Sequence, residues 1–79
     1  MKIHFYGRLA DSFGPDIDFS IAESCSVDDL RMRLAAEHPD AASLLGPPVR
    51  ACVGDMMVAG DYVVNPNDSV EFLPPVSGG

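Results

Sequence analysis

Hydrophobic and polar residues alternate along the start of the chain in the pattern typical of β-strands. The alternation over residues 2–6, in a run that continues to Leu9, predicts a half-buried first strand. Residues 16–21 repeat the alternation and predict a second strand. Gly and Pro within residues 11–15 are typical of a turn, so the two strands are expected to form a hairpin.

A helix is predicted to begin after Ser26, because Asp29 follows three positions later as in a capping box. Apolar residues then recur at helical spacing and give the helix one buried face: Val27, Leu30 and Leu34. Pro39 is expected to stop the helix near His38, because the residue before a proline avoids the helical region. The charged residues off the apolar face are expected to be solvated: Arg31, Arg33 and Glu37.

The rest of the chain predicts a further helical turn and three more strands. The expected elements are a helical turn over 40–45, strands over 49–53, 56–58 and 69–73, and turns at 54–55 and 65–68. Pro74 and Pro75 are expected to end the pairing of the last strand, because proline cannot donate a ladder hydrogen bond.

The order strand, strand, helix, strand, short strand, strand predicts an α+β fold. We expect one mixed sheet of four to five strands with a single main helix packed on one face. The first and last strands are then expected to meet at the centre, which is the β-grasp, ubiquitin-like arrangement. The predicted division is a β-grasp domain over residues 1–73 and a flexible carrier tail over 74–79.

The composition fits one small folded domain with an acidic surface. Of the 79 residues, 47% are hydrophobic and 22% are charged, with 12 acidic and 5 basic residues, for a net charge of −7. This charge disfavours nucleic-acid binding, because phosphate backbones are repelled. It is compatible both with simple solubility and with steering toward a basic partner.

The chain contains no apolar run long enough for a transmembrane helix and no apolar signal region at its start. We therefore expect a cytoplasmic protein that does not bind a membrane. The spacing of Cys25 and Cys52 suggests neither a disulfide nor a redox motif, so both thiols are expected to be unreactive.

Side chains offer no recognisable catalytic set. Neither a Ser-His-Asp arrangement, nor a metal-ligand cluster, nor a Gly-rich phosphate loop is present. His4 and His38 are expected to be surface or structural residues. The chain is therefore expected to be non-catalytic on its own and to bind no cofactor, so any ATP must be bound mainly by a partner.

The tail provides a different chemistry. Two prolines favour a stiff, extended lead, and Gly78 and Gly79 then end the chain without side chains. Such an end can enter a channel too narrow for side chains, and its α-carboxylate is ionised at neutral pH. An ionised carboxylate can attack the α-phosphate of ATP, after which a sulfur nucleophile can displace AMP.

Residues 72–79, which read FLPPVSGG, closely resemble the C-terminal signature of the small, sulfur-carrying subunits of molybdopterin synthase. The segments 2–7, 26–30, 51–54 and 65–68 fit the same family at matching spacings. The resemblance covers the whole chain, and the tail is its most specific part.

This resemblance implies a β-grasp fold and a carrier function. A separate enzyme would adenylate Gly79 with Mg-ATP, and a sulfur donor protein would convert it to a thiocarboxylate. The large synthase subunit would receive the tail in a heterotetramer, where sulfur passes to cyclic pyranopterin monophosphate to make molybdopterin. The remaining tail residues would lead Gly79 to these partners: Pro74, Pro75, Val76, Ser77 and Gly78.

Phe72 and Leu73 are the main candidates for the partner interface, although alternation puts one of them inward. For Met56, Met57 and Tyr62 core packing is favoured, and for Arg8 a solvated charge at a strand end. Three alternative functions stay open: a sulfur carrier for thiamin or another pathway, a ubiquitin-like protein modifier, and a β-grasp interaction domain with an inert tail.

Overall fold

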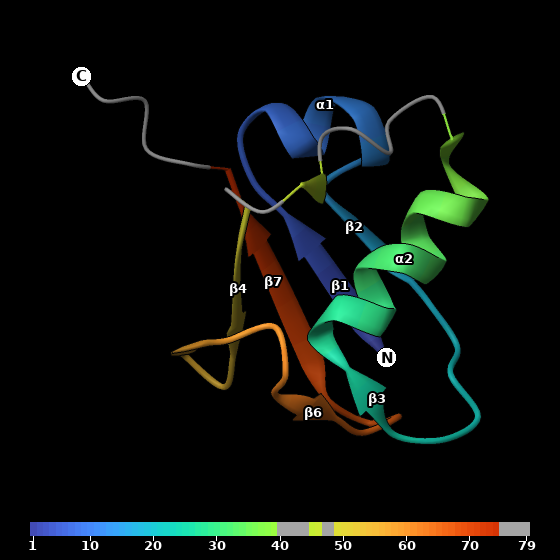
Figure 1. Cartoon of the computed structure of the whole chain (residues 1–79). Helices are drawn as coiled ribbons and strands as arrows, with labels where there is room; N and C mark the ends of the chain where they lie inside the picture. The colour runs from blue at the N-terminus through green and yellow to red at the C-terminus, as the bar shows by residue number, and fades with distance from the viewer. Residues whose placement is uncertain (40–44, 47–48, 75–79) are drawn as a thin grey trace.

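The fold of the computed structural model is a five-stranded mixed sheet with helix α2 (Val27–Glu37) across one face. Figure 1 shows α2 in front of the central strands. The structure describes residues 1–39, 45–46 and 49–74. The sheet strands, in spatial order, are β2 (Asp16–Asp18), β1 (Lys2–Phe5), β7 (Ser69–Leu73), β4 (Arg50–Val53) and β5 (Met56–Val58). β1 and β7 pair in parallel at the centre, and the other neighbours are antiparallel. The predicted β-grasp arrangement is confirmed.

The hairpin of β1 and β2 is confirmed, but its connection contains a helix that the sequence pattern did not predict. Helix α1 (Arg8–Phe13) replaces the expected continuation of the first strand to Leu9. Gly7, with φ 57°, turns the chain out of the strand, and Leu9 and Phe13 then pack into the core from one side of the helix. Their i, i+4 spacing between two glycines was the available signal.

The second strand is shorter than its alternation predicted, because its partner ends. Asp18 pairs with Lys2, and Phe19 donates a last backbone hydrogen bond to the Met1 carbonyl at 2.9 Å. Ile21 is buried although it lies beyond the end of β2, so the alternation correctly marked its burial but not the length of the strand. A second sheet, too short for any periodic pattern, pairs β3 (Cys25–Ser26) with β6 (Val63–Val64).

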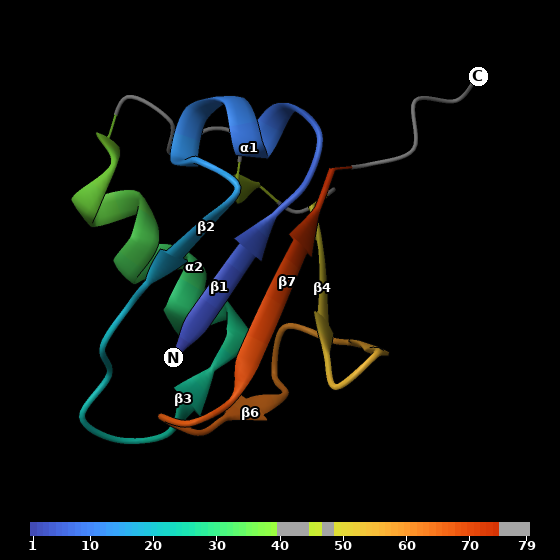
Figure 2. The same ribbon diagram turned by 180° about the vertical axis from the view of Figure 1, so that it is seen from behind.

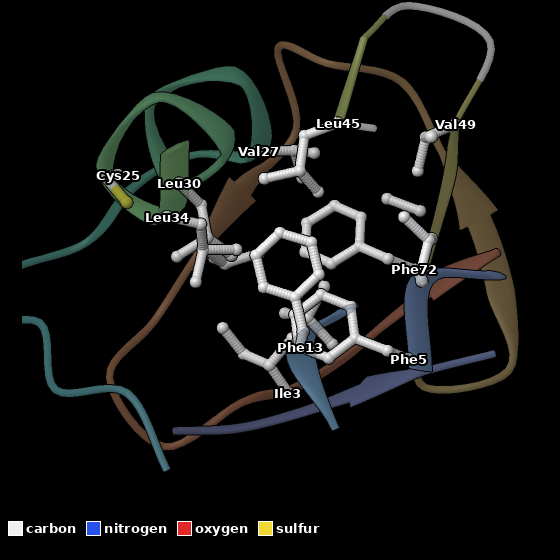
Figure 3. Close-up of a cluster of buried hydrophobic side chains, with 14 of the residues drawn as sticks. Ile3, Phe5, Phe13, Cys25, Val27, Leu30, Leu34, Leu45, Val49 and Phe72 are labelled. Carbon is white, nitrogen blue, oxygen red and sulfur yellow. The ribbon is translucent and has the colours of Figure 1, made fainter. Parts of the chain in front are cut away.

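The core lies between the sheet and α2 and has an aromatic centre, which Figure 3 shows. The ring of Phe5 stacks on Phe13 at 4.6 Å between centroids and on Phe72 at 5.9 Å. Leu30 and Leu34 reach these rings from α2 and are fully buried. The parallel pairing of β1 with β7 thus brings the two ends of the chain into one packed unit.

Helix α2 begins and ends where the sequence predicted. The Oγ of Ser26 accepts a hydrogen bond from the Asp29 backbone N–H at 3.0 Å, as a capping residue does. The helix ends at Glu37, and His38 donates its backbone N–H to the Leu34 carbonyl. The helical turn predicted over 40–45 lies, apart from Leu45, outside the described residues.

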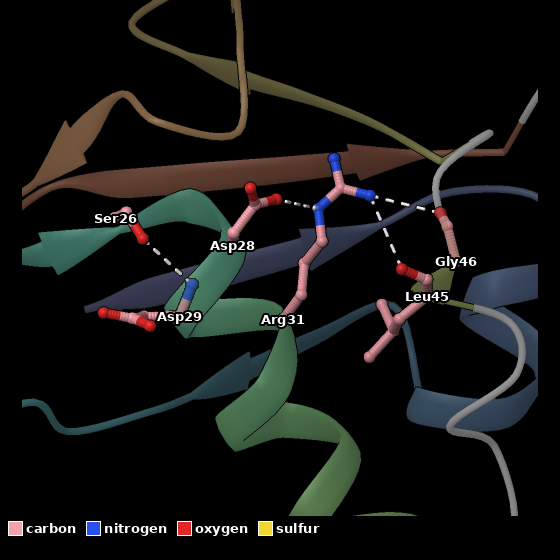
Figure 4. A network of polar contacts seen from close by, with 6 residues as sticks. All are labelled: Ser26, Asp28, Asp29, Arg31, Leu45 and Gly46. Carbon is pink, nitrogen blue, oxygen red and sulfur yellow. Dashed lines mark hydrogen bonds and ion pairs between the residues drawn. The ribbon is translucent and has the colours of Figure 1, made fainter.

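The prediction that Arg31 is solvated is wrong: its side chain is only 15% exposed. Figure 4 shows its guanidinium reaching from α2 to the carbonyl oxygens of Leu45 and Gly46, at 3.4 and 3.2 Å. The guanidinium carbon also lies 5.7 Å from the centre of the Phe72 ring, and Nε faces Asp28 at 3.9 Å. Arg31 therefore ties the segment that follows the helix to the core, because these carbonyls need a donor.

The predicted strands of the second half are confirmed with small shifts in their ends. The turn between β4 and β5 has positive φ at both central residues, 56° at Gly54 and 66° at Asp55, as tight hairpins require. Asp68 donates its backbone N–H to the Asn65 carbonyl and closes the predicted turn before β7. In the described part of the chain, every helix is too short or too polar to cross a bilayer.

Candidate functional site

The candidate site is the place where the chain leaves the sheet after β7. Pro74 is the last described residue, and the predicted tail residues Pro75, Val76, Ser77, Gly78 and Gly79 lie outside the described residues. The domain boundary at residue 74 therefore stays a prediction. We use the name tail root for the side chains and backbone around this exit: Tyr6, Gly7, Arg50, Leu73 and Pro74.

Strand pairing positions the tail root on two sides. The Tyr6 backbone N–H donates to the Phe72 carbonyl at 3.2 Å and extends the parallel ladder by one bond. Leu73 is the Cα partner of Arg50 on the neighbouring antiparallel strand. The exit of the tail is thus fixed by pairing with both flanking strands, and sites on strands are positioned more precisely than sites on loops.

Gly7 lies against Pro74 and leaves no room for a side chain. A Cβ built on Gly7 would be 2.9 Å from Cγ of Pro74, closer than real Cβ contacts come. The backbone of Gly7, with φ 57° and ψ −132°, is also one that L-residues avoid. Both facts make Gly7 a residue that sets the direction in which the tail leaves the domain.

Replacing Gly7 by Ala is therefore expected to lower the free energy of unfolding by about 1–3 kcal/mol, since strained φ/ψ values cost that much. Chemical denaturation measures the loss. The matched control is Gly54→Ala, which has a similar φ of 56° but no atom within 4 Å of the added Cβ. If both variants lose equal stability, the contact with Pro74 contributes nothing.

The prediction that Phe72 belongs to the partner interface is wrong, because its side chain is 0% exposed and lies in the aromatic core. Side chains of a strand alternate between the faces of a sheet, so Glu71 and Leu73 point to the opposite side. We call this side, which faces away from α2, the outer face; Figure 2 shows β1 and β7 in front of α2 from that direction. Leu73 is half-buried there and stays a candidate.

The outer face near the tail root carries apolar side chains. Cross-strand partners share a face, so Cys52 lies beside Glu71 and Met57 beside Cys52. Tyr6 is 45% and Met57 60% exposed. Nη1 of Arg50 lies 3.6 Å from Sδ of Met57. These residues form an exposed surface of mixed apolar and cationic character next to the tail exit.

The hydroxyl of Tyr6 donates a hydrogen bond to Oε2 of Glu71 at 2.8 Å. This bond, together with the negative charge of Glu71, raises the pKa of the Tyr6 phenol above its ordinary value. The phenol therefore stays protonated over the whole physiological range. The bond also occupies Glu71, the carboxylate at the middle of this surface, and fixes the Tyr6 ring against β7.

Several other sequence predictions are corrected by the exposed side chains. Met56 and Met57 are 61% and 60% exposed and Tyr62 is 39% exposed, so the expected core packing of all three is wrong. β5 is the edge of the sheet, where one side of a strand has no neighbour to cover it. Arg8 is exposed as expected, but at the start of helix α1 and not at a strand end.

Of the histidines and cysteines, His4 and Cys52 lie on the outer face as the strand partners of Glu71, and His38 and Cys25 lie away from it. The ring of His38 packs edge-on against Phe13 at 5.1 Å, which is a structural role. Cys25 is buried at the start of α2, while Cys52 is partly exposed on the outer face. The tail root therefore contains a surface for contact and an exit for the chain, and the described residues around it contribute no nucleophile–base pair.

Comparison with known proteins gives consistent matches over nearly the whole chain. The family model described as the ThiS family matches residues 3–79. The molybdopterin synthase sulfur carrier subunit of Escherichia coli K12 is 30% identical over 80 residues, covering 100% of this chain and 99% of that protein.

Two solved structures share the fold. A Pyrococcus furiosus protein assigned provisionally as molybdopterin converting factor subunit 1 superposes with a TM-score of 0.81 at 22% identity, covering 95% of each chain. Small archaeal modifier protein 1 of Haloferax volcanii gives a TM-score of 0.80 at 18% identity, also covering 95% of each chain. At these identities the two structures establish the β-grasp fold and nothing about function.

Proposed function

Because this chain belongs to the ThiS family, we propose that it is the sulfur carrier subunit of a molybdopterin synthase, with its reactive group at Gly79. The observation that carries the proposal is the full-length match to the E. coli sulfur carrier subunit, at 30% identity. That relative favours the pterin pathway over thiamin synthesis. The ordered tail root supports it, because a carrier needs a rigid body that presents a reactive chain end.

The proposed activation has two steps. A carboxylate oxygen of Gly79 attacks the α-phosphorus of Mg-ATP bound to an adenylating enzyme, and pyrophosphate leaves with its electron pair. A sulfur nucleophile supplied by a donor protein then attacks the acyl carbon, and AMP leaves. If that nucleophile is the terminal sulfur of a persulfide, the product is an acyl disulfide; a thiol then attacks the donor sulfur, forms a disulfide with it and releases the thiocarboxylate on Gly79. The partner shields the acyl-adenylate from water.

Delivery requires a second partner, the large subunit of the synthase. The thiocarboxylate tail enters its active site, where the sulfur forms a bond to a carbon of cyclic pyranopterin monophosphate and an oxygen substituent leaves that carbon. Water then hydrolyses the acyl–sulfur bond and returns Gly79 to a carboxylate. Two such transfers complete the dithiolene of molybdopterin, and the proposed synthase is a heterotetramer of two small and two large subunits. Mg-ATP as the activating reagent agrees with the cytoplasmic location expected from the sequence.

In this function the body of the domain serves for docking. Tyr6, Met57 and Leu73 place apolar surface beside the tail exit, and such surface forms the centre of protein interfaces. A partner that covers these residues also fixes where the tail enters its channel. Positioning of this kind matters, because small misplacements of a reacting group reduce rates strongly.

The experiment is intact mass analysis after incubation with the adenylating enzyme, Mg-ATP and a sulfur source. We expect a gain equal to the mass difference between sulfur and oxygen, located by fragmentation to Gly79. A persulfide on Cys52 would instead add a whole sulfur atom, so the two outcomes are distinct. The Cys52→Ala variant is the control and should gain the same mass as the wild type; modification of a cysteine with Gly79 unchanged would contradict the proposal.

A further inference from the structure

Arg50 is an exposed cation at the tail root that forms no ion pair with the described residues. Within the described residues, the ion pairs join Lys2 to Asp18 at 3.1 Å and Arg31 to Asp28 at 3.9 Å. Arg50 takes part in neither and is exposed at the tail root. Arg8 and Arg33 are also exposed and outside these pairs, so what distinguishes Arg50 is its place at the tail root, opposite Leu73.

The surroundings of Arg50 are apolar. Its Cα partner is Leu73, and its Nη1 contacts Sδ of Met57 at 3.6 Å. The thioether is a weak acceptor and leaves the other donors of the guanidinium available. Glu71 lies on the neighbouring strand but is hydrogen-bonded to Tyr6 and forms no ion pair with Arg50, and Asp16 and Asp18 belong to β2 at the far edge of the sheet.

We propose that Arg50 pairs with a carboxylate on the partner protein, at the rim of the opening into which the tail passes. A planar guanidinium matches a carboxylate with two parallel hydrogen bonds and is weakly hydrated, so it suits the edge of an apolar contact. Tyrosine and arginine are also the residues that most often dominate binding energy at interfaces. The inference rests on the proposed carrier function, because it assigns the chemistry of the surface that receives the tail.

A phosphate of ATP is the alternative anion, and chain length argues against it. Five residues separate Pro74 from the end of the chain, and extended residues span roughly 17 Å over that length. A tail drawn out into a narrow channel puts the reacting carboxylate at that distance from Arg50. The guanidinium then meets the rim of the partner and not the nucleotide.

The test measures the affinity of full-length variants for the molybdopterin synthase large subunit of the same genome, by calorimetry at low and high salt. Arg50→Gln should weaken binding about tenfold at roughly 50 mM salt, the effect of losing one charge-assisted hydrogen-bonded pair. The difference should shrink at high salt, because ions screen the exposed pair. Arg50→Lys keeps the positive charge but lacks the planar guanidinium, so its affinity should lie between those of the wild type and Arg50→Gln.

Arg33→Gln is the matched control, since it removes the same charge from an exposed position on α2, and it should bind like the wild type. Melting curves check that each variant is folded. If Arg50→Gln binds as tightly as the wild type at low salt while Met57→Gln binds more weakly, the proposal that Arg50 pairs with a carboxylate is wrong. The proposed carrier function is not affected by that result. If the wild type neither binds the large subunit nor forms a thiocarboxylate, the role of Arg50 and the proposed carrier function are both wrong.

Discussion

Deletion of Gly79 is expected to reduce sulfur transfer at least about 100-fold, although the shortened chain still ends in a glycine carboxylate. The loss follows from reach: one residue spans about 3.5 Å, and a reacting group displaced by only about 1 Å can lose that factor. The carboxylate of Gly78 would stop short of the nucleotide and later of the pterin. Transfer is measured as thiocarboxylate formed and as molybdopterin produced with the large subunit.

Two variants separate the effect of tail length from other effects of the deletion. Gly79→Ala keeps the length and the carboxylate but adds a Cβ, so it should lose activity only as far as the partner channel excludes a side chain. Ser77→Ala keeps both length and terminus and should transfer sulfur normally. The melting curve of the deletion variant should match the wild type, because the described core ends at Phe72. A clear loss of stability would assign the tail a structural role, and retained transfer would place the reactive group elsewhere.

The sequence predicted β7 and α2 most directly, because each buries one face along its length. Val70 and Phe72 share the core face of β7, so their spacing alone identifies the strand. Ser26 marks the start of α2, because its hydroxyl satisfies a local backbone donor and needs no distant partner. Patterns of this kind depend on neighbours within a few residues, which a sequence displays directly.

The errors arise where distant residues decide the outcome. Leu9 and Phe13 pack on the sheet and turn an apparent strand into helix α1. Arg31 is mostly covered because the chain returns to place the Leu45 and Gly46 carbonyls beside it. The contact of Arg31 has no signature within a window of the sequence, whereas the i, i+4 spacing of Leu9 and Phe13 was a local signal that the preceding strand alternation obscured. Tertiary packing overrode the local pattern in both cases.

In the candidate site, too, some residues could be predicted from the sequence and others depended on distant contacts. The terminal glycines are predicted from the sequence, because their chemistry needs no folded environment. The choice between Phe72 and Leu73 was also available: Glu71 marks the solvent side of β7, and alternation then places Leu73 toward solvent. The contact of Arg50 with Met57 was not available, because it joins residues on two strands whose register only the folded sheet defines.

Phe72 and Leu73 are adjacent in β7, and their replacement by Ala is expected to have opposite consequences. Phe72→Ala should lower the free energy of unfolding by about 3–5 kcal/mol, the usual loss for a large aromatic side chain removed from a core. The ring is fully buried, stacks on Phe5 at 5.9 Å and lies 5.7 Å from the Arg31 guanidinium carbon, so its loss leaves a cavity at the centre of the domain.

That loss is comparable with the whole stability of a marginal small domain, which begins at about 5 kcal/mol. The melting temperature of Phe72→Ala should fall by about 15 °C or more, since each kcal/mol shifts a domain of this size by about 4–8 °C. Leu73→Ala should melt near the wild type, because Leu73 is half-buried on the outer face, but it should bind the large subunit more weakly. Thermal denaturation and binding, measured on both variants, separate the two roles. If Leu73→Ala proved the less stable of the pair, the assignment of faces in β7 would be wrong, and the surface proposed for docking would be wrong with it.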